Sequence, residues 1–66
     1  MVLTINGESK EVDDGLNIEE VLKILNLPNE RVAVELNLSV IRKAEWSVTK
    51  LRDGDKLEII HFVGGG

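Results

Sequence analysis

Hydrophobic and polar residues at the start of the chain alternate with the period of a half-buried β-strand. Residues 1–5 place large apolar side chains at every second position. Asn6-Gly7 follows, and this dipeptide favours a two-residue hairpin turn, because both positions of that turn need a positive φ. The chain then returns over residues 8–12 as a more polar strand, which we expect at an edge of the sheet, and residues 13–15 close it with a turn.

A helix is predicted over residues 18–26. Asn17 precedes this segment and Glu20 follows three residues later, which is the spacing of a capping box with Asn in place of Ser or Thr. We expect Pro28 to stop the helix, because proline interrupts the helical hydrogen bonds. The apolar stripe that would face a sheet consists of Ile18, Val21, Leu22 and Leu25.

Three further strands are predicted in the second half of the chain. Residues 32–36 alternate between apolar and less apolar side chains, residues 37–39 indicate a turn, and residues 40–41 form a short partner strand. Residues 53–55 indicate another turn, and residues 56–62 form the last strand.

The segment that precedes the last turn, residues 42–50, has an irregular pattern, in which we expect Trp46 and Val48 to anchor the backbone on the core. No repeat, linker or low-complexity stretch divides the chain, so we predict a single domain over residues 1–66. Two strands, a helix and further strands predict an α+β fold.

Composition narrows the possible functions. A chain of 66 residues buries only about 60% of its unfolded surface, which leaves little room for an internal substrate pocket. Its formal net charge of −4 disfavours nucleic acid and anionic membranes and favours a basic protein partner. The chain has no cysteine, no apolar run of membrane-spanning length and no signal-peptide pattern, so we expect a cytoplasmic location.

The polar residues do not suggest a catalytic or metal site. Asp13-Asp14 and Glu19-Glu20 lie in a predicted turn and at a predicted helix start, where solvated or dipole-complementing roles are more probable than acid–base chemistry. His61 stands without a nucleophile or a metal-binding partner in the sequence, so we interpret it as packed or solvated. We therefore predict that the protein is not an enzyme, with no catalytic residues, no bound cofactor and no metal ligands.

The C-terminus is the strongest functional signal. Three glycines follow the last strand, so a thin tail ends in a free carboxylate that suits another protein's active site. We assign Gly66 as the reactive carboxylate, and Gly64 and Gly65 as the residues that thread through a narrow channel, because glycine has wide conformational freedom. We expect residues 63–66 to be flexible. The alternative is a linker or a frayed end without function.

The last strand also predicts a docking surface next to this tail. Leu57 and Ile59 should face the core, which leaves large apolar residues on the opposite face of the sheet. The alternatives are that a loop covers these residues or that they are ordinary surface positions. The predicted docking residues are Glu58, Ile60, Phe62 and Val63, and the same face would extend to Ala33 and Glu35.

Four segments, residues 32–37, 43–46, 53–59 and 61–66, together form a recognisable pattern. On these segments the chain resembles the ThiS family, the sulfur carriers of thiamin thiazole synthesis, over essentially its whole length. The resemblance implies a ubiquitin-like β-grasp fold, with a mixed sheet of four to five strands and one main helix packed on one face. Leu38-Ser39 departs from the family pattern, in which a glycine-containing turn is expected.

The resemblance also implies a definite chemistry. In this family an adenylating enzyme of the ubiquitin-activating type (ThiF-like) uses ATP to activate the terminal carboxylate, here that of Gly66. Sulfur then replaces an oxygen, and the resulting thiocarboxylate serves a thiazole synthase (ThiG-like) as sulfur donor. Two alternatives stay open: a related carrier for molybdopterin synthesis, tRNA thiolation or cysteine synthesis, and a non-covalent ubiquitin-like interaction module.

Overall fold

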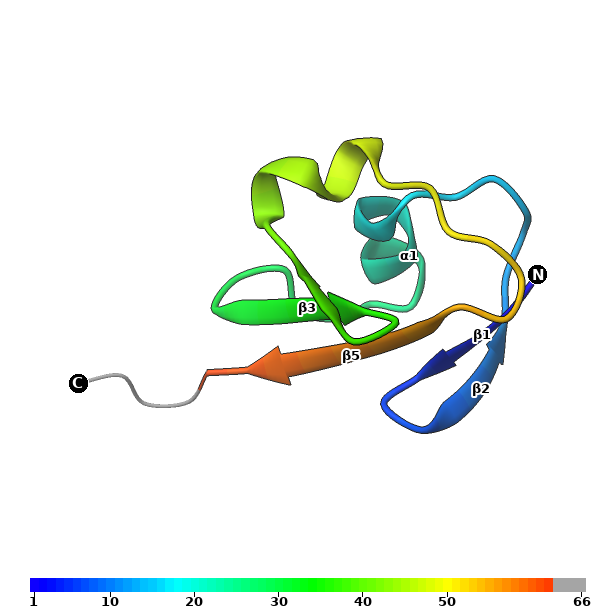
Figure 1. Ribbon diagram of the computed structural model, residues 1–66, viewed down its shortest axis with the longest axis horizontal. Coiled ribbons are helices and arrows are strands. Elements are labelled where there is room, and N and C mark those ends of the chain that lie inside the picture. Colours follow the sequence, from blue (N-terminus) through cyan, green and yellow to red (C-terminus); the bar gives the residue numbers. More distant parts are fainter. Residues whose placement is uncertain (63–66) are drawn as a thin grey trace.

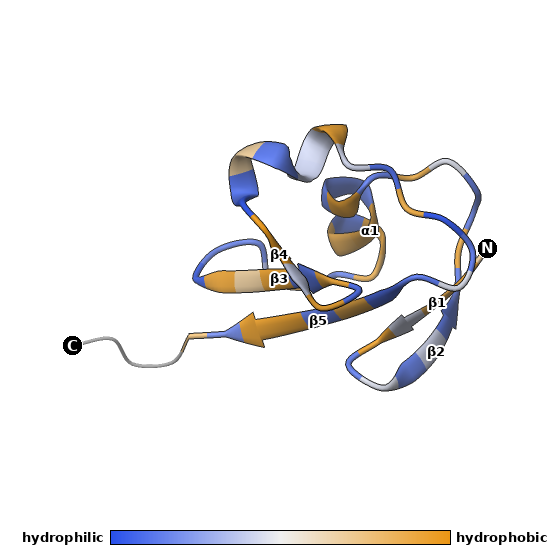
Figure 2. Ribbon diagram, in the orientation of Figure 1, coloured by the Kyte–Doolittle hydropathy of each residue, from blue (hydrophilic) through white to orange (hydrophobic). Residues whose placement is uncertain are grey.

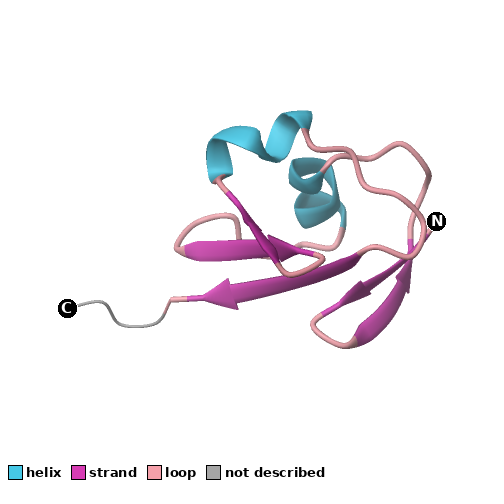
Figure 3. Ribbon diagram, viewed as in Figure 1, coloured by secondary structure: helices cyan, strands magenta, loops and turns pink. Residues whose placement is uncertain are grey.

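The structure, a computed structural model, describes residues 1–62. A five-stranded mixed sheet carries one α-helix and one 3₁₀ helix on the same face (Figures 1 and 3). The order of the strands in the sheet is β2-β1-β5-β3-β4. The elements are β1 (Val2–Ile5), β2 (Glu8–Glu11), α1 (Ile18–Ile24), β3 (Val32–Leu36), β4 (Ser39–Ile41), the 3₁₀ helix η1 (Lys43–Val48) and β5 (Lys56–His61).

The last strand of the chain occupies the centre of the sheet. β5 runs parallel to β1, with Thr4 opposite Lys56, and antiparallel to β3, with Val34 opposite Ile59. The predicted α+β fold and its mixed sheet are confirmed. The prediction that residues 8–12 form an edge strand is also correct, because β2 lies at one end of the sheet and its four residues are exposed.

Both hairpins close with the same two-residue turn. In the β1–β2 hairpin Asn6 and Gly7 have φ values of 50° and 82°, as the sequence predicts. In the β3–β4 hairpin Asn37 and Leu38 take φ values of 49° and 73°, so a leucine occupies a position that favours glycine. The departure at Leu38 therefore leaves the turn geometry intact and places an L-residue in a left-handed conformation.

Helix α1 begins where the sequence predicts and ends two residues early. Asn17 accepts a hydrogen bond from the Glu20 N–H at 2.8 Å, and the Glu20 carboxylate accepts one from the Asn17 N–H at 2.9 Å, so the capping box is formed. The prediction that Pro28 stops the helix is wrong. Asn26 adopts a left-handed φ of 54°, and a hydrogen bond from the Leu27 N–H to the Leu22 carbonyl completes a Schellman motif, which ends the helix.

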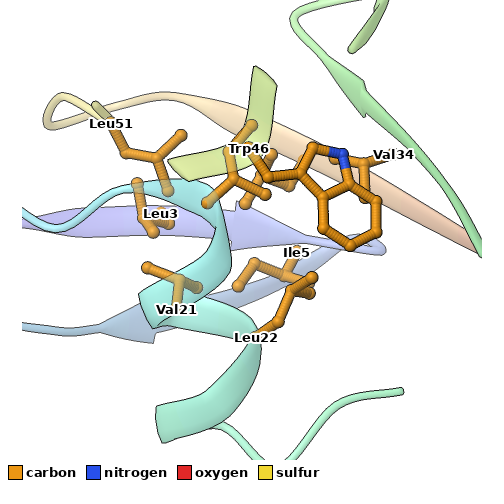
Figure 4. Close-up of a cluster of buried hydrophobic side chains, with 9 residues drawn as sticks. Leu3, Ile5, Val21, Leu22, Val34, Trp46 and Leu51 are labelled. Carbon is orange, nitrogen blue, oxygen red and sulfur yellow. The ribbon is translucent and has the colours of Figure 1, made fainter. Parts of the chain in front are cut away.

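The core lies between the sheet and the two helices (Figure 4). Trp46 is only 2% exposed, and its indole N–H donates to the Ile41 carbonyl at 3.0 Å, so its predicted role as an anchor is confirmed. The prediction for Val48 is wrong, because its side chain is 76% exposed. Two residues advance about 240° around a 3₁₀ helix, so Trp46 and Val48 of η1 cannot both face the core. The buried core residues are Leu3, Ile5, Ile18, Val21, Leu22, Val34, Trp46, Leu51 and Leu57.

The first residue is tied into the fold. The Met1 ammonium donates to the Val12 carbonyl at 2.6 Å and forms an ion pair with Asp14 at 2.8 Å. The hydrogen bond to Asp14 raises the pKa of the Met1 ammonium, and the same hydrogen bond lowers the pKa of the Asp14 carboxyl. The next residue is fixed as well, since the Val2 N–H donates to the Asp53 carboxylate at 2.6 Å.

Neither helix in residues 1–62 is long and apolar enough to span a membrane.

Candidate docking face and C-terminal attachment site

Strand β5 carries two of the predicted docking residues, Glu58 and Ile60, on the face of the sheet that the helices leave open, and Phe62 follows its last residue. Leu57 is buried and Ile59 packs against the core, whereas Ile60 is 43% exposed and Phe62 is 57% exposed. This alternation confirms which side of the sheet each residue occupies. Figure 2 shows hydrophobic stretches of β5 interrupted by hydrophilic ones. The docking role itself stays a prediction.

Two neighbouring strands extend this surface. Cross-strand register places Ala33 opposite Ile60 and Glu35 opposite Glu58, as the sequence predicts. On β4, Val40 lies opposite Glu35, and its side chain is 67% exposed. Sequence reasoning missed Val40, although the two-residue turn fixes its register with Glu35 once the hairpin is recognised. We call this surface the outer face, and its residues are Ala33, Glu35, Val40, Glu58, Ile60 and Phe62.

The outer face combines apolar side chains with two adjacent carboxylates. Glu35 and Glu58 are direct cross-strand partners, a position in which like charges repel. Within residues 1–62 neither carboxylate forms an ion pair with a Lys, an Arg or the N-terminus. These two charges are therefore available to a cationic group on a partner.

The residues that would react lie beyond the described part of the chain. Val63, predicted to dock, and Gly64 and Gly65, predicted to thread, fall outside residues 1–62, as does the attachment residue Gly66. The prediction that residues 63–66 are flexible lies outside the described residues as well and stays a prediction. What the structure does show is where the tail starts: β5 ends on the opposite side of the molecule from the N-terminus (Figure 1).

Other candidate groups have structural explanations. Asp14 pairs with the N-terminal ammonium, and Glu20 closes the capping box, so both carboxylates are engaged in the fold. His61 lies at the exposed end of β5. Within residues 1–62 no three His, Asp or Glu side chains are arranged to hold a metal ion.

A small pocket lies on the helix side, between the β1–β2 hairpin and the end of α1. Its volume is about 160 Å³, and the sequence analysis gives no indication of it. The Asn6 amide at its margin is already engaged by the backbone of Ile59. Its lining residues are Ile5, Asn6, Glu8, Lys10, Leu25 and Leu27.

Comparison with solved structures and with curated proteins identifies relatives over the whole chain. A crystal structure of the thiamine biosynthesis protein ThiS from Geobacter metallireducens is 40% identical and covers all of both chains, with a TM-score of 0.87. The sulfur carrier protein ThiS of Bacillus subtilis is 39% identical over 66 residues, which is 98% of this chain and 100% of that protein.

Two thiazole synthases also contain a stretch similar to the chain. The protein from Paramagnetospirillum magneticum is 41% identical over 66 residues, and that from Magnetococcus marinus is 35% identical. The match covers the full chain but only 20% of each synthase, so the chain spans about a fifth of their length.

The family comparison agrees with these relatives. The ThiS family matches residues 3–66, which includes all the helices and strands described in residues 1–62 except the first residue of β1, and also the three terminal glycines. The chain therefore belongs to the ThiS family.

Proposed function

We propose that the protein is a sulfur carrier of thiamin biosynthesis, whose Gly66 carboxylate is adenylated by an ATP-dependent activating enzyme and converted to a thiocarboxylate. The observation that carries this proposal is the family match through residue 66, on a fold whose central strand ends beside exposed apolar side chains. The thiocarboxylate would donate its sulfur during formation of the thiazole ring.

The terminal carboxylate needs activation before it can accept sulfur. A carboxylate is ionised at neutral pH and is a poor electrophile. In the proposed step, a Gly66 carboxylate oxygen attacks the α-phosphate of ATP, and pyrophosphate leaves. A sulfur nucleophile then attacks the carbonyl carbon of the acyl-adenylate, and AMP leaves with the bridging oxygen. Since glycine has no side chain, no Cβ of Gly66 hinders this attack.

The chain itself supplies no sulfur nucleophile. It contains no cysteine, so the sulfur must come from outside the chain: either sulfide, which gives the thiocarboxylate directly, or a partner's persulfide, which gives an acyl disulfide that a second thiol then cleaves to the thiocarboxylate and a new disulfide. In the proposed chemistry this chain carries the transferred sulfur on its terminal carbonyl. The protein therefore acts as a co-substrate of the enzymes that load and unload it.

We propose the outer face as the docking surface for the activating enzyme. Ile60 and Phe62 stand exposed directly before the tail, so a partner that covers them also receives the chain end. The Glu35–Glu58 pair favours a basic group at the centre of the partner's surface. The overall charge of −4 acts in the same direction.

The second proposed partner is a thiazole synthase. Two proteins with that name contain a stretch similar to this entire chain. Covalent linkage of two domains raises their effective concentration for each other, which is useful when both act on one intermediate. This relationship favours thiamin synthesis over the other sulfur-transfer pathways that a β-grasp carrier serves.

Intact-mass measurement tests the proposal. The protein is incubated with ATP, a sulfide source and a candidate activating enzyme, and we expect a mass shift equal to replacement of one oxygen by sulfur, located in the C-terminal peptide. A variant that lacks Gly66 should show no shift. The thiocarboxylate form is then added to thiazole synthase, and we expect the mass of the carrier to return to that of the carboxylate form.

Each outcome separates the alternatives. A thiocarboxylate that a molybdopterin synthase consumes and a thiazole synthase leaves intact would point to another pathway. Absence of both adenylate and thiocarboxylate with every candidate activating enzyme would favour a non-covalent interaction module.

A further inference from the structure

Strand β1 covers only the first part of its edge of β5. The two strands pair at Thr4–Lys56 and Ile5–Leu57, and the Asn6 N–H then donates to the Leu57 carbonyl at 2.9 Å. At this point the chain turns away into the β1–β2 hairpin. The backbone of β1 is therefore absent from the edge of β5 beyond Leu57.

The side chain of Asn6 completes one more step of the ladder. Its Oδ1 accepts a hydrogen bond from the Ile59 N–H at 2.7 Å, and its Nδ2 donates to the Ile59 carbonyl at 3.3 Å. One primary amide thus satisfies both backbone groups of Ile59, as a residue of a neighbouring strand would. The next backbone groups that point in this direction belong to His61.

The opposite edge of β5 stays paired to its end. β3 lies alongside β5 as far as His61, and the Phe62 N–H donates to the Arg31 carbonyl at 2.7 Å. Since the backbone groups of an antiparallel strand alternate in direction, those of Ile60 and Phe62 point towards β3. The N–H and C=O of His61 point the other way, towards the edge that β1 and Asn6 leave uncovered.

We propose that an extended segment of the activating enzyme adds to the sheet at this open edge, with backbone hydrogen bonds to the N–H and C=O of His61. This inference rests on the proposed function and specifies how the activating enzyme binds the carrier. Main-chain pairing of this kind holds an extended segment without demands on its side chains.

The position of the tail argues for the enzyme as the occupant. Four residues follow Phe62, and they span at most about 14 Å when extended. Any enzyme that holds the Gly66 carbonyl at its active site must therefore place the mouth of its channel beside the last residues of β5. The exposed side chains of Ile60 and Phe62 adjoin the same strand end and would contact the same partner.

The outer edge of the sheet at β2 differs in a way that supports this choice. β2 consists of Glu8, Ser9, Lys10 and Glu11, and charged residues on an edge strand discourage pairing with another chain. The open edge is formed by His61 and contains no Asp, Glu, Lys or Arg. It also lies between the capping amide of Asn6 and the start of the tail, so its length suits a short segment.

Two proline variants form a matched test. His61→Pro removes the N–H that we assign to the partner, and Ser9→Pro removes an N–H that points outward from β2, because Ile5–Glu8 is the hydrogen-bonded pair that closes the hairpin. With the activating enzyme and ATP, we expect His61→Pro to raise KM for adenylation roughly five- to tenfold, the loss of about one hydrogen bond, while Ser9→Pro leaves it unchanged.

A synthetic protein with an ester in place of the Ile60–His61 peptide bond provides a variant that keeps every side chain. It removes the same N–H, and an ester at Glu8–Ser9 is its control. Amide exchange supplies a second measurement: binding of the enzyme should slow exchange of the His61 N–H and leave the Ser9 N–H unaffected.

The outcomes are separable from those of the proposed function. Equal adenylation by both members of each pair, with wild-type activity intact, would overturn strand addition and leave the sulfur-carrier proposal standing. Slow His61 exchange that depends on the concentration of the isolated protein would assign the edge to a second copy of the chain, and would also overturn it. No adenylation of the wild-type protein would instead contradict the proposed function.

Discussion

Glu35 of β3 and Glu58 of β5 lie directly opposite each other on the outer face, and neither forms an ion pair within residues 1–62. Like charges in this arrangement destabilise a sheet. We expect Glu58→Gln to raise the free energy of unfolding by about 0.2–1 kcal/mol, as measured by urea denaturation. The same change should weaken binding to a basic activating enzyme and reduce the salt dependence of association.

A control separates the two effects. Glu11→Gln removes a charge from β2, at the edge of the sheet and separated from β5 by β1, so it should leave the salt dependence of association unchanged. If Glu58→Gln and Glu11→Gln behave alike, only net charge matters and the position of the pair does not.

Phe62→Ala should affect docking and leave stability almost unchanged. The side chain is 57% exposed and lies beyond the last residue of β5, so its truncation removes little buried contact. A large aromatic residue at an interface contributes at least about 1–2 kcal/mol, so we expect KM for adenylation to rise about tenfold. Thermal denaturation and initial rates of pyrophosphate release measure the two quantities.

Val48→Ala is the matched control for Phe62→Ala. Val48 is also exposed, but it lies on η1, on the helix side of the sheet. Its truncation should change neither KM nor the melting temperature. A marked loss of stability in Phe62→Ala would place Phe62 in the core and contradict its assignment to a docking surface.

Leu38→Gly should stabilise the protein. Leu38 has a φ of 73° and a side chain that is 91% exposed, so glycine relieves the left-handed strain and sacrifices almost no packing. The strain is about 1–2 kcal/mol, and the greater freedom of glycine in the unfolded chain offsets part of it. We expect a net gain of about 0.5–1 kcal/mol in urea denaturation, whereas Leu38→Ala, which keeps the Cβ, should give no such gain.

The ion pair between Met1 and Asp14 predicts loss of stability at both extremes of pH. The pKa of the ammonium is raised from its usual 8.0, so its contribution is complete below pH 8.0 and disappears as the pH rises through the raised value. The pKa of Asp14 is lowered from 3.8, so its contribution is complete above that pH and disappears as the pH falls through the lowered value.

Asp14→Asn should reduce the loss of unfolding free energy at both low and high pH. Unfolding free energies measured across pH 2–10 give the comparison, with Asp13→Asn as the control, since Asp13 is adjacent in sequence and forms no ion pair within residues 1–62. Identical profiles for the wild type and Asp14→Asn would show that the ion pair contributes nothing to folding.

Local chemistry made much of the fold predictable from the sequence. The capping box, which spans only the four residues from Asn17 to Glu20, determines where α1 starts, and Asn6-Gly7 determines the turn of the first hairpin. The end of α1 was harder to predict, because Pro28 is a more conspicuous signal than the left-handed conformation of Asn26. Val48 was misplaced because only the 3₁₀ geometry of η1 decides which apolar residue faces inward.

The candidate site was predictable only where neighbours in sequence determine it. The alternation along β5 places Glu58, Ile60 and Phe62 on one face. The contribution of Val40 depends on strand order, and the two hydrogen bonds between the Asn6 side chain and the Ile59 backbone join residues 53 positions apart. Such partners are set by the three-dimensional arrangement of the strands, which no local pattern records.

The central position of β5 has a mechanical consequence. An enzyme that grips the tail and then releases it applies tension along β5, which is bonded to β3 on one side and to β1 and Asn6 on the other. Tension in this direction loads those hydrogen bonds in shear, so several must break together before the strand slides. When the carrier leaves the enzyme, its tail can therefore be pulled out of a narrow channel without unfolding the domain.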